Sequence, residues 1–166
     1  MRIREFDHTR DSQALSDLFI ALQDFERRLV PGIPEGSTVA GPYIELMLAR
    51  CRTWDGRIFV ADSGNRIVGF VCVWARMRSD EPDDGPSEYA FVSDLIVDSA
   101  HRGRGVGRML MSAAEHYAGE RGSPRLRVRV LARNIVARGL YRTMGFSDYE
   151  IELEKRLRAA TAAERE

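Results

Sequence analysis

The glycine-rich stretch Arg102-Gly103-Arg104-Gly105-Val106-Gly107 constrains the fold most, because it lies between an expected strand and an expected helix. Glycine lets the backbone adopt positive φ angles and approach a ligand closely. Free backbone N–H groups at a helix start, together with the helix dipole, favour an anion such as a pyrophosphate. In α/β folds, a glycine-rich turn between strand and helix is a typical anion site. Residues 95–108 are therefore the first candidate site.

The same stretch does not fit two common nucleotide-binding motifs. A GxGxxG fingerprint that begins at Gly103 requires a glycine at position 108, which is Arg108. The Gly-Lys-Ser/Thr triplet of a Walker loop does not occur in the sequence. The alternative to an anion site is a surface turn with basic side chains.

Hydrophobic periodicity and turn residues predict alternating helices and strands along the chain. The first helix carries the stripe Leu15, Leu18, Phe19, Leu22 and Phe25. The elements expected, in order, are a strand at 3–6, a helix capped by Asp11 or Ser12, a helix starting between Ser37 and Pro42, strands at 57–62, 66–77 and 89–97, a helix from about Gly105, a strand at 126–131, a short helix capped by Asn134, and a strand at 149–157. The strands at 89–97 and 126–131 are expected to be parallel, joined by a right-handed crossover.

Composition narrows the class of protein. The 166 residues are 44% hydrophobic and carry 25 basic and 25 acidic side chains, which suits one globular domain and argues against nucleic acid or anionic lipid as partners. The longest apolar run, Ile67–Ala75, is too short to span a membrane, and the N-terminus does not read as a signal peptide, so a cytoplasmic location is expected. Cys51, Cys72 and the scattered histidines offer neither a disulfide framework nor a metal site.

A second motif follows the predicted parallel strand, with Asn134, Ala137, Leu140-Tyr141 and Gly145-Phe146 on and after a short helix. With it the chain resembles the GNAT superfamily of acyl-CoA-dependent N-acetyltransferases. The likeness covers nearly the whole chain in element order and is sharpest in 94–108 and 134–146. It implies an α/β (α+β) fold with a mostly antiparallel central sheet, a parallel splayed strand pair and helices on both faces. One domain would cover residues 1–157, followed by a polar tail at 158–166.

The resemblance also implies a binding site for acetyl-CoA and no metal. In it, the strand around Leu95–Val97 pairs with the pantetheine arm, the loop surrounds the pyrophosphate, Asn134 contacts the pantetheine and Tyr141 lies near the thioester sulfur. The implied cofactor-binding residues are Leu95, Ile96, Val97, Arg102, Gly103, Arg104, Gly105, Val106, Gly107, Arg108, Asn134 and Tyr141.

Tyr141 is the expected general acid. A phenol with a pKa of ~10 is protonated at neutral pH, whereas a departing thiolate has a conjugate acid of pKa ~8.5. Tyr141 can therefore donate a proton to the leaving group. The alternative interpretation is a core aromatic on an amphipathic helix.

The base is less clear from the sequence. Regular alternation places Phe91 and Ser93 on the face of Leu95 and Val97, and directs Asp94 to the opposite face. Ser93 is then a candidate to hold a water molecule. Asp94 is a candidate base if the strand contains a bulge.

Charged residues give conflicting indications of the acceptor. An acidic stretch favours a cationic amine as acceptor: Asp80, Glu81, Asp83 and Asp84. An alternating set of arginines favours an acceptor that carries a carboxylate: Arg125, Arg127 and Arg129. Glu26 is a further candidate for the acceptor pocket, and its alternative interpretation is a solvated helix face.

The expected function is transfer of an acetyl group to a primary amine on a small molecule or a peptide. The amine would attack directly in a ternary complex, and the protein could form a homodimer. The alternative is a non-catalytic acyl-CoA sensor of the same fold. A nucleic-acid face on the arginines is disfavoured by the zero net charge.

Overall fold

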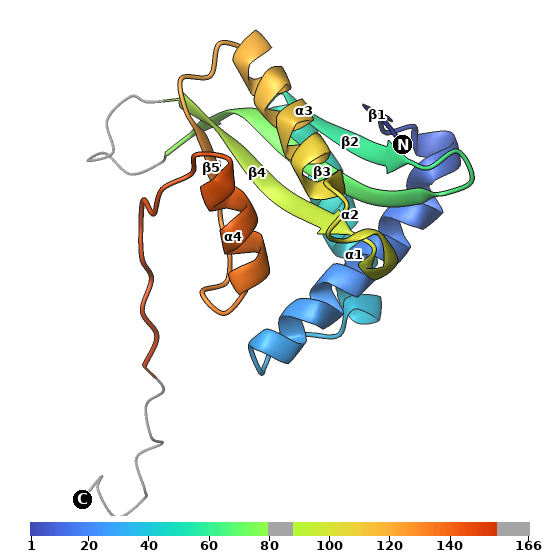
Figure 1. Ribbon diagram of the computed structural model, residues 1–166, viewed down its shortest axis with the longest axis horizontal. Helices are drawn as coiled ribbons and strands as arrows, with labels where there is room; N and C mark the ends of the chain where they lie inside the picture. Colours follow the sequence, from blue (N-terminus) through green and yellow to red (C-terminus); the bar gives the residue numbers. More distant parts are fainter. Residues whose placement is uncertain (80–87, 156–166) are drawn as a thin grey trace, which may run out of the picture.

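The computed structural model describes residues 1–79 and 88–155 of the chain (Figure 1). The elements are β1 (Arg2–Glu5), α1 (His8–Leu29), α2 (Gly36–Thr53), β2 (Gly56–Asp62), β3 (Ile67–Arg78), β4 (Glu88–Val97), a short 3-10 helix η2 (Ser99–His101), α3 (Val106–Glu120), β5 (Leu126–Val128) and α4 (Ile135–Thr143). Within these residues the expected order of helices and strands is confirmed through α4.

The central sheet has the strand order β1-β2-β3-β4-β5 in the described part of the chain. The first three neighbouring pairs are antiparallel, and β4 pairs with β5 in parallel. The α/β fold predicted from the sequence, mostly antiparallel with one parallel pair, is thus confirmed.

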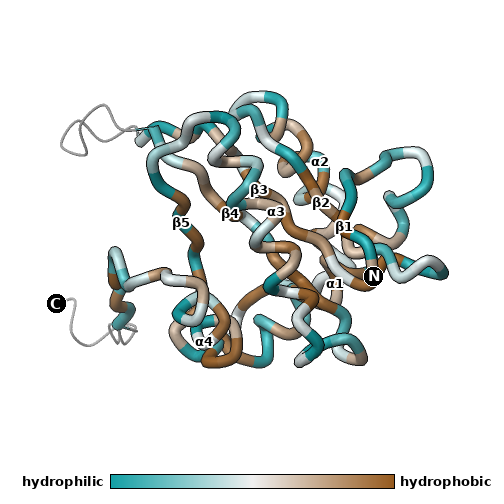
Figure 2. The backbone as a smooth tube through the Cα atoms, turned by 45° about the horizontal axis from the view of Figure 1, so that its top comes forward, coloured by the Kyte–Doolittle hydropathy of each residue, from teal (hydrophilic) through white to brown (hydrophobic). Residues whose placement is uncertain are grey.

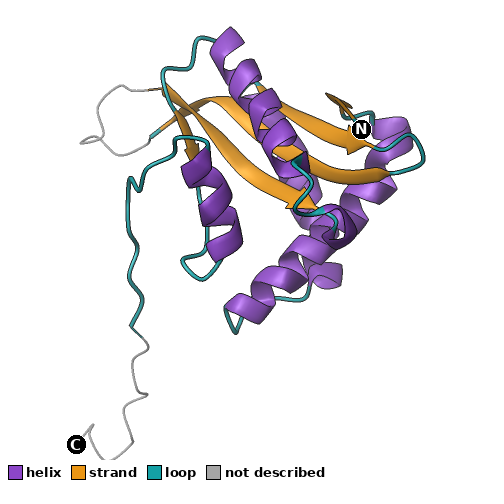
Figure 3. Cartoon of the chain, viewed as in Figure 1, coloured by secondary structure: helices purple, strands orange, loops and turns teal. Residues whose placement is uncertain are grey.

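Helices cover both faces of the sheet, as expected (Figure 3). On one face, α3 and α4 pack over a core that includes Val71, Val92 and Leu110. On the other face, α1 and α2 pack over a core that includes Phe19, Met47 and Phe70. Cys72 is fully buried in this second core, as its apolar surroundings in the sequence predict.

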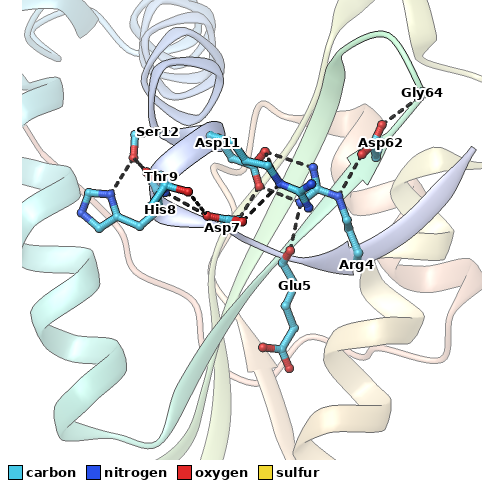
Figure 4. Close-up of polar contacts among 10 residues, drawn as sticks. Arg4, Glu5, Asp7, His8, Thr9, Asp11, Ser12, Asp62 and Gly64 are labelled. Atoms are coloured by element: carbon cyan, nitrogen blue, oxygen red, sulfur yellow. Dashed lines mark hydrogen bonds and ion pairs between the residues drawn. The ribbon is translucent and has the colours of Figure 1, made fainter.

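An arginine joins the first strand to the first helix and the second strand (Figure 4). The Arg4 guanidinium donates hydrogen bonds to both oxygens of Asp11, at 2.6 and 3.0 Å, and to Asp62 Oδ2 at 2.8 Å. Asp11 and Ser12 lie inside α1, so neither of these expected residues is its N-cap. The N-cap is Asp7, because α1 begins one turn earlier than its apolar stripe indicates.

Two further boundaries differ from the sequence prediction. Helix α2 begins at Gly36, just before the expected window, and contains Pro42 in its second turn. The strand expected at 149–157 is wrong for 149–155, the part that the structure describes, since these residues pair with no strand. Its apolar side chains Tyr149, Ile151 and Leu153 are 66%, 75% and 89% exposed. Residues 156–157, the tail at 158–166 and the acidic stretch Asp80–Asp84 lie outside the described residues.

Candidate active site

The sheet opens where β4 and β5 stop pairing. Their parallel ladder joins Ala90 to Leu126, Phe91 to Arg127 and Val92 to Val128, and it ends there. Strand β4 continues to Val97 along β3, whereas β5 ends at Val128, short of the predicted residue 131. The backbone edge of β4 beyond Val92 therefore faces an open wedge, which is the splayed strand pair that the resemblance implies.

A β-bulge in β4 lies at the mouth of this wedge. Cys72 of β3 is opposite Asp94, but the next residue, Val73, is opposite Val92, so Ser93 is an extra residue in the ladder. The bulge changes which side chains share a face. Phe91 packs in the core under α1 and α2, whereas Leu95 and Val97 pack in the core under α3 and α4.

The predicted common face of Phe91, Ser93, Leu95 and Val97 is consequently wrong. The prediction assumed unbroken alternation along the strand, which an extra residue interrupts. The extra residue precedes Asp94, so Asp94 stays on the face opposite Leu95 and Val97, where its carboxylate contacts Tyr43 of α2.

A cavity of about 180 Å³ occupies the wedge. Helix α1 contributes Glu26, α2 contributes Tyr43, β4 contributes Asp94, and α4 contributes Tyr141. The complete lining is Phe19, Leu22, Gln23, Glu26, Tyr43, Val92, Ser93, Asp94, Leu95, Val128, Arg129, Val130, Asn134, Ala137 and Tyr141. The structure thus brings together the three predicted catalytic candidates Ser93, Asp94 and Tyr141, with Glu26 and Arg129 beside them.

Asp94 is a buried carboxylate with two hydroxyl donors. Ser93 Oγ donates to Asp94 Oδ2 at 2.7 Å, and Tyr43 Oη donates to Oδ1 at 3.0 Å. Burial raises the pKa of the Asp94 carboxyl, while the two hydrogen bonds and the charge of Arg50 act in the opposite direction. A carboxylate with a raised pKa is better matched to accepting a proton near neutral pH.

Tyr141 and Glu26 are two further titratable groups in the cavity. Tyr141 is 7% exposed, and no described residue hydrogen bonds to its hydroxyl. Burial, with the charges of Glu26 and Asp94, raises the pKa of Tyr141 to about 12. Burial and the charge of Asp94 also raise the pKa of Glu26, which has no ion pair within the described residues. The sequence favoured a solvated helix face for Glu26, but its side chain is half-buried and lines the cavity.

The glycine-rich loop forms the start of α3. Gly103 and Gly105 have φ angles of +71° and +79°, a conformation that other residues rarely adopt. Gly105 is the N-cap and no side chain caps the helix, so the first backbone N–H groups of α3 lack intrahelical acceptors. A Cβ at either glycine would meet no described atom within 4 Å. The loop therefore offers an exposed set of N–H donors to an anion.

The arginine side chains of the loop have different contacts. Arg102 Nε donates to the carbonyl of Val97 at 2.9 Å, and its guanidinium lies over the Phe25 ring. Arg108 Nη2 donates to Thr143 Oγ1 at 2.7 Å, which ties α3 to α4. Arg104 is exposed.

Asn134 serves as the N-cap of α4, as predicted, with its Oδ1 accepting from Ala137 N at 3.1 Å. The same residue lines the cavity, so the cap lies at the wedge. This contact fixes the start of the helix that carries Tyr141.

Sequence reasoning did not identify Tyr43. Its ring stacks on Phe19 with centroids 4.4 Å apart, and this contact directs the hydroxyl toward Asp94. The available signal was helical spacing, because Tyr43, Met47 and Arg50 share one face of α2. A tyrosine at such a position is indistinguishable from a core aromatic in the sequence alone.

Residues 1–79 and 88–155 contain neither a candidate membrane span nor a candidate metal site. None of the helices there combines the length and the apolar character that spanning a membrane requires. In the same residues, no group of three or more His, Cys, Asp or Glu side chains is arranged to hold a metal ion.

Comparison with known proteins identifies the family. The model of the acetyltransferase (GNAT) family matches residues 20–146. The N-acetyltransferase YhfO of Bacillus subtilis is 28% identical over 148 residues, which cover 89% of this chain and 91% of that protein. Streptothricin acetyltransferase of Streptomyces lavendulae is 43% identical over 56 residues, 34% of this chain and 30% of that protein.

Solved structures share the fold. A mutant of the BH1408 protein from Bacillus halodurans has a TM-score of 0.78 at 20% identity, covering 95% of this chain and 99% of that chain. AAC(6')-Iy, solved in complex with the bisubstrate analogue CoA-S-monomethyl-acetylneamine, has a TM-score of 0.63 at 20% identity and covers 95% and 98%. The family match spans most of the chain and includes both the glycine-rich loop and α4, so this chain belongs to the GNAT acetyltransferase family.

Proposed function

We propose that this protein transfers an acetyl group from acetyl-CoA to a primary amine by direct attack in a ternary complex, with Tyr141 as the general acid. One observation carries the proposal: the Tyr141 hydroxyl and the Asp94 carboxylate line the same cavity, in the wedge between β4 and β5. The glycine-rich loop follows the end of β4, so a bound acyl donor has a route from the loop into the wedge.

The residues around the wedge fit an acyl-CoA. Backbone N–H groups from Arg102 to Arg108 would hold the pyrophosphate, and the free edge of β4 at Leu95–Val97 would hydrogen bond to the pantetheine arm. Asn134 is placed to contact the same arm. The donor supplies the thioester, whose carbonyl carbon the amine attacks.

Tyr141 donates a proton, or a hydrogen bond, to the sulfur as the thioester bond breaks. Its pKa of about 12 keeps the phenol protonated throughout the neutral range. Its hydroxyl is not engaged by another described residue, so it is available to the leaving group.

Asp94 accepts the proton that the amine loses on attack. Its carboxylate lines the cavity, and Ser93 and Tyr43 hold it in one orientation. Ser93 is then a positioning residue, because its hydroxyl donates to Asp94.

Glu26 provides the negative charge that attracts a cationic acceptor. Its carboxylate is half-buried in α1 and faces the cavity without an ion-pair partner in the described residues. An ammonium group would supply that partner, and it would release one proton to solvent before the neutral amine attacks.

A panel of amines, amino acids, polyamines, aminoglycosides and peptide N-termini, scored by release of the CoA thiol, tests the function. We expect at least one class to give turnover, and Glu26→Gln to raise KM for a cationic acceptor more than it lowers kcat. Calorimetric titration with acetyl-CoA accompanies the panel. Tight binding of acetyl-CoA without turnover on any amine would contradict the proposal and favour a sensor of the same fold.

A further inference from the structure

The cavity in the wedge is lined by side chains of both charges. Glu26 of α1 and Asp94 of β4 are carboxylates, and Arg129, which directly follows β5, contributes a guanidinium. Asp94 accepts hydrogen bonds from Ser93 and Tyr43, whereas the side chains of Glu26 and Arg129 have no partner in the part of the chain that the structure describes. One carboxylate and one guanidinium are therefore available to a ligand in this cavity.

Arg129 points to the side of the sheet that carries α1 and α2. The apolar residues that alternate with the arginines here border the core under α3 and α4 (Figure 2 shows the hydrophobic stretch along β5): Leu126, Val128 and Val130. Because side chains alternate along a strand, Arg129 lies on the opposite face. Glu26 belongs to α1, and Asp94 contacts Tyr43 of α2, so both carboxylates come from that side too. The three charged groups gather there, whereas the glycine-rich loop begins α3 on the other face.

Of the three alternating arginines, Arg129 is the one that lines the cavity. Arg127 is held elsewhere, because its guanidinium lies 4.1 Å from the ring of Tyr89 and 4.1 Å from the ring of Tyr149. Arg125 is exposed and does not line the cavity. The sequence indicated a carboxylate on the acceptor from all three arginines, and the structure narrows this indication to Arg129.

The two unpaired charges discriminate between classes of amine. A polyamine or an aminoglycoside carries several ammonium groups, and one that lies near Arg129 is repelled. An amine without other charges pairs with Glu26 and leaves the guanidinium unused. An amino acid supplies both partners, because its ammonium pairs with Glu26 and its carboxylate accepts hydrogen bonds from Arg129. The volume of about 180 Å³ lies below the ~300–1,000 Å³ of pockets for drug-sized ligands, which also favours a small acceptor.

We propose that the acceptor is a free amino acid, bound by its carboxylate at Arg129 and by its ammonium at Glu26. This inference rests on the proposed function, since it names the class of amine that receives the acetyl group. Arg129 determines specificity and takes no part in the bond changes.

The reaction is balanced with the groups already described. The ammonium loses one proton to solvent, and the neutral amine attacks the thioester carbonyl carbon, so that a C–N bond forms and the C–S bond breaks. Asp94 accepts the second proton of the amine, and Tyr141 gives its proton to the thiolate. The products are an N-acetylamino acid and CoA, and Asp94 and Tyr141 regain their protonation states through solvent.

Matched acceptors test the proposal. Each L-amino acid is compared with its α-carboxamide, which keeps the amine and the side chain but lacks the carboxylate, by release of the CoA thiol. The amine of the amide is less basic, so the ratio of kcat/KM for acid and amide is compared between wild type and Arg129→Gln, where this difference cancels. We expect the ratio to be about tenfold higher in wild type, since Arg129 is also open to solvent.

Two further variants separate charge from geometry. Arg129→Lys should retain part of the ratio, because it keeps the positive charge but loses the paired N–H groups of the guanidinium. Arg125→Gln is the matched control and should keep the wild-type ratio, because Arg125 does not line the cavity. Turnover on amines with the same ratio in wild type and Arg129→Gln overturns this proposal and leaves acetyl transfer standing.

Calorimetry distinguishes a failure of this proposal from a failure of the proposed function. If no amine is turned over, the proposed function fails, and titration of amino acids into the protein with CoA present tests the carboxylate site separately. Binding that Arg129→Gln weakens about tenfold supports the site. Amino acids that do not bind, or that bind both proteins equally, overturn it.

Discussion

The Tyr43 hydroxyl of α2 lies 3.0 Å from Asp94 Oδ1 and 3.2 Å from Oδ2, so one phenol donates to the single buried carboxylate of β4. The contact joins a helix on one face of the sheet to the strand that borders the wedge. Burial raises the pKa of Tyr43, and the charge of Asp94 raises it further, so the phenol keeps its proton and remains a hydrogen-bond donor. The orientation and the proton affinity of Asp94 both depend on this contact.

Tyr43→Phe is expected to move the acidic limb of the pH–rate profile to higher pH by roughly one unit. The hydrogen bond favours the ionised form of Asp94, so its loss raises the pKa of a carboxyl that burial already raises. Because a carboxyl must be ionised to accept a proton, the variant loses activity at low pH before the wild type does. The measurement is kcat/KM from pH 5 to 9. Tyr117→Phe is the matched control, because Tyr117 donates to Asp55, outside the cavity. An unmoved limb in the Tyr43 variant would show that Asp94 is not the base.

Tyr141→Phe is expected to lower kcat roughly 10²-fold, within the range for a positioned proton donor. Affinity for acetyl-CoA should barely change, because the hydroxyl acts as negative charge develops on sulfur. Single-turnover rates are the right measurement, since they isolate the chemical step. The ratio of the two rates should stay constant from pH 7 to 10, because the pKa of Tyr141 is about 12. Equal single-turnover rates would mean that another group protonates the leaving thiolate.

Gly105→Val is expected to weaken acetyl-CoA binding at least tenfold, or ~1.4 kcal/mol. The φ angle of +79° at Gly105 disfavours a β-branched residue, so the substitution displaces the N–H groups at the start of α3. Isothermal titration calorimetry measures the affinity, and circular dichroism checks the fold. Gly119→Ala is the control within the same helix, where a Cβ meets no described atom within 4 Å and φ is not positive. Unchanged affinity in a folded Gly105 variant would remove the loop from the donor site.

Arg4→Met is expected to destabilise the protein by about 3 kcal/mol at pH 7, because it removes the guanidinium that donates to both oxygens of the buried Asp11 carboxylate. The hydrogen bond from Arg4 lowers the pKa of Asp11. This stabilisation is complete above the unfolded value of ~3.9 and is lost as pH falls through the lower folded value. Urea unfolding at pH 7 and pH 2.5 should therefore show the variant's deficit shrinking in acid. Arg27→Met, which removes an exposed guanidinium 3.0 Å from Glu35, is the control and should have a much smaller effect, because it is a surface pair.

Local signals predicted the loop, α4 and the cap at Asn134, because glycine, helical periodicity and an Asx cap act within a few residues of one another. The face of Phe91 relative to Leu95 and Val97 could not be predicted in this way. Alternation along a strand gives the relative faces of its residues until an extra residue interrupts it, and the bulge at Ser93 depends on the register with β3. The end of β5 at Val128 likewise depends on its neighbour and not on the apolar pattern, which continues to Val130.

The segment at 149–155 illustrates the same limit. Its alternation of apolar and acidic residues is typical of a strand, but the pattern does not name a pairing partner. Within one copy of the described chain no strand lies against it. A pattern of residues therefore predicts a preference for extended backbone, whereas pairing requires that the segment lie beside an unpaired strand of the sheet.

Ser93 is the extra residue of β4 in its ladder with β3, because Cys72 lies opposite Asp94 and the next residue, Val73, lies opposite Val92. If it were deleted, Val92, Asp94 and Leu95 would keep their faces, because regular alternation already assigns them so. The bulge at Ser93 directly follows Val92, the last residue of β4 that pairs with β5, so the extra residue marks the point where the two parallel strands part. The wedge thus begins at a position that is defined by chain length and not by the chemistry of a side chain.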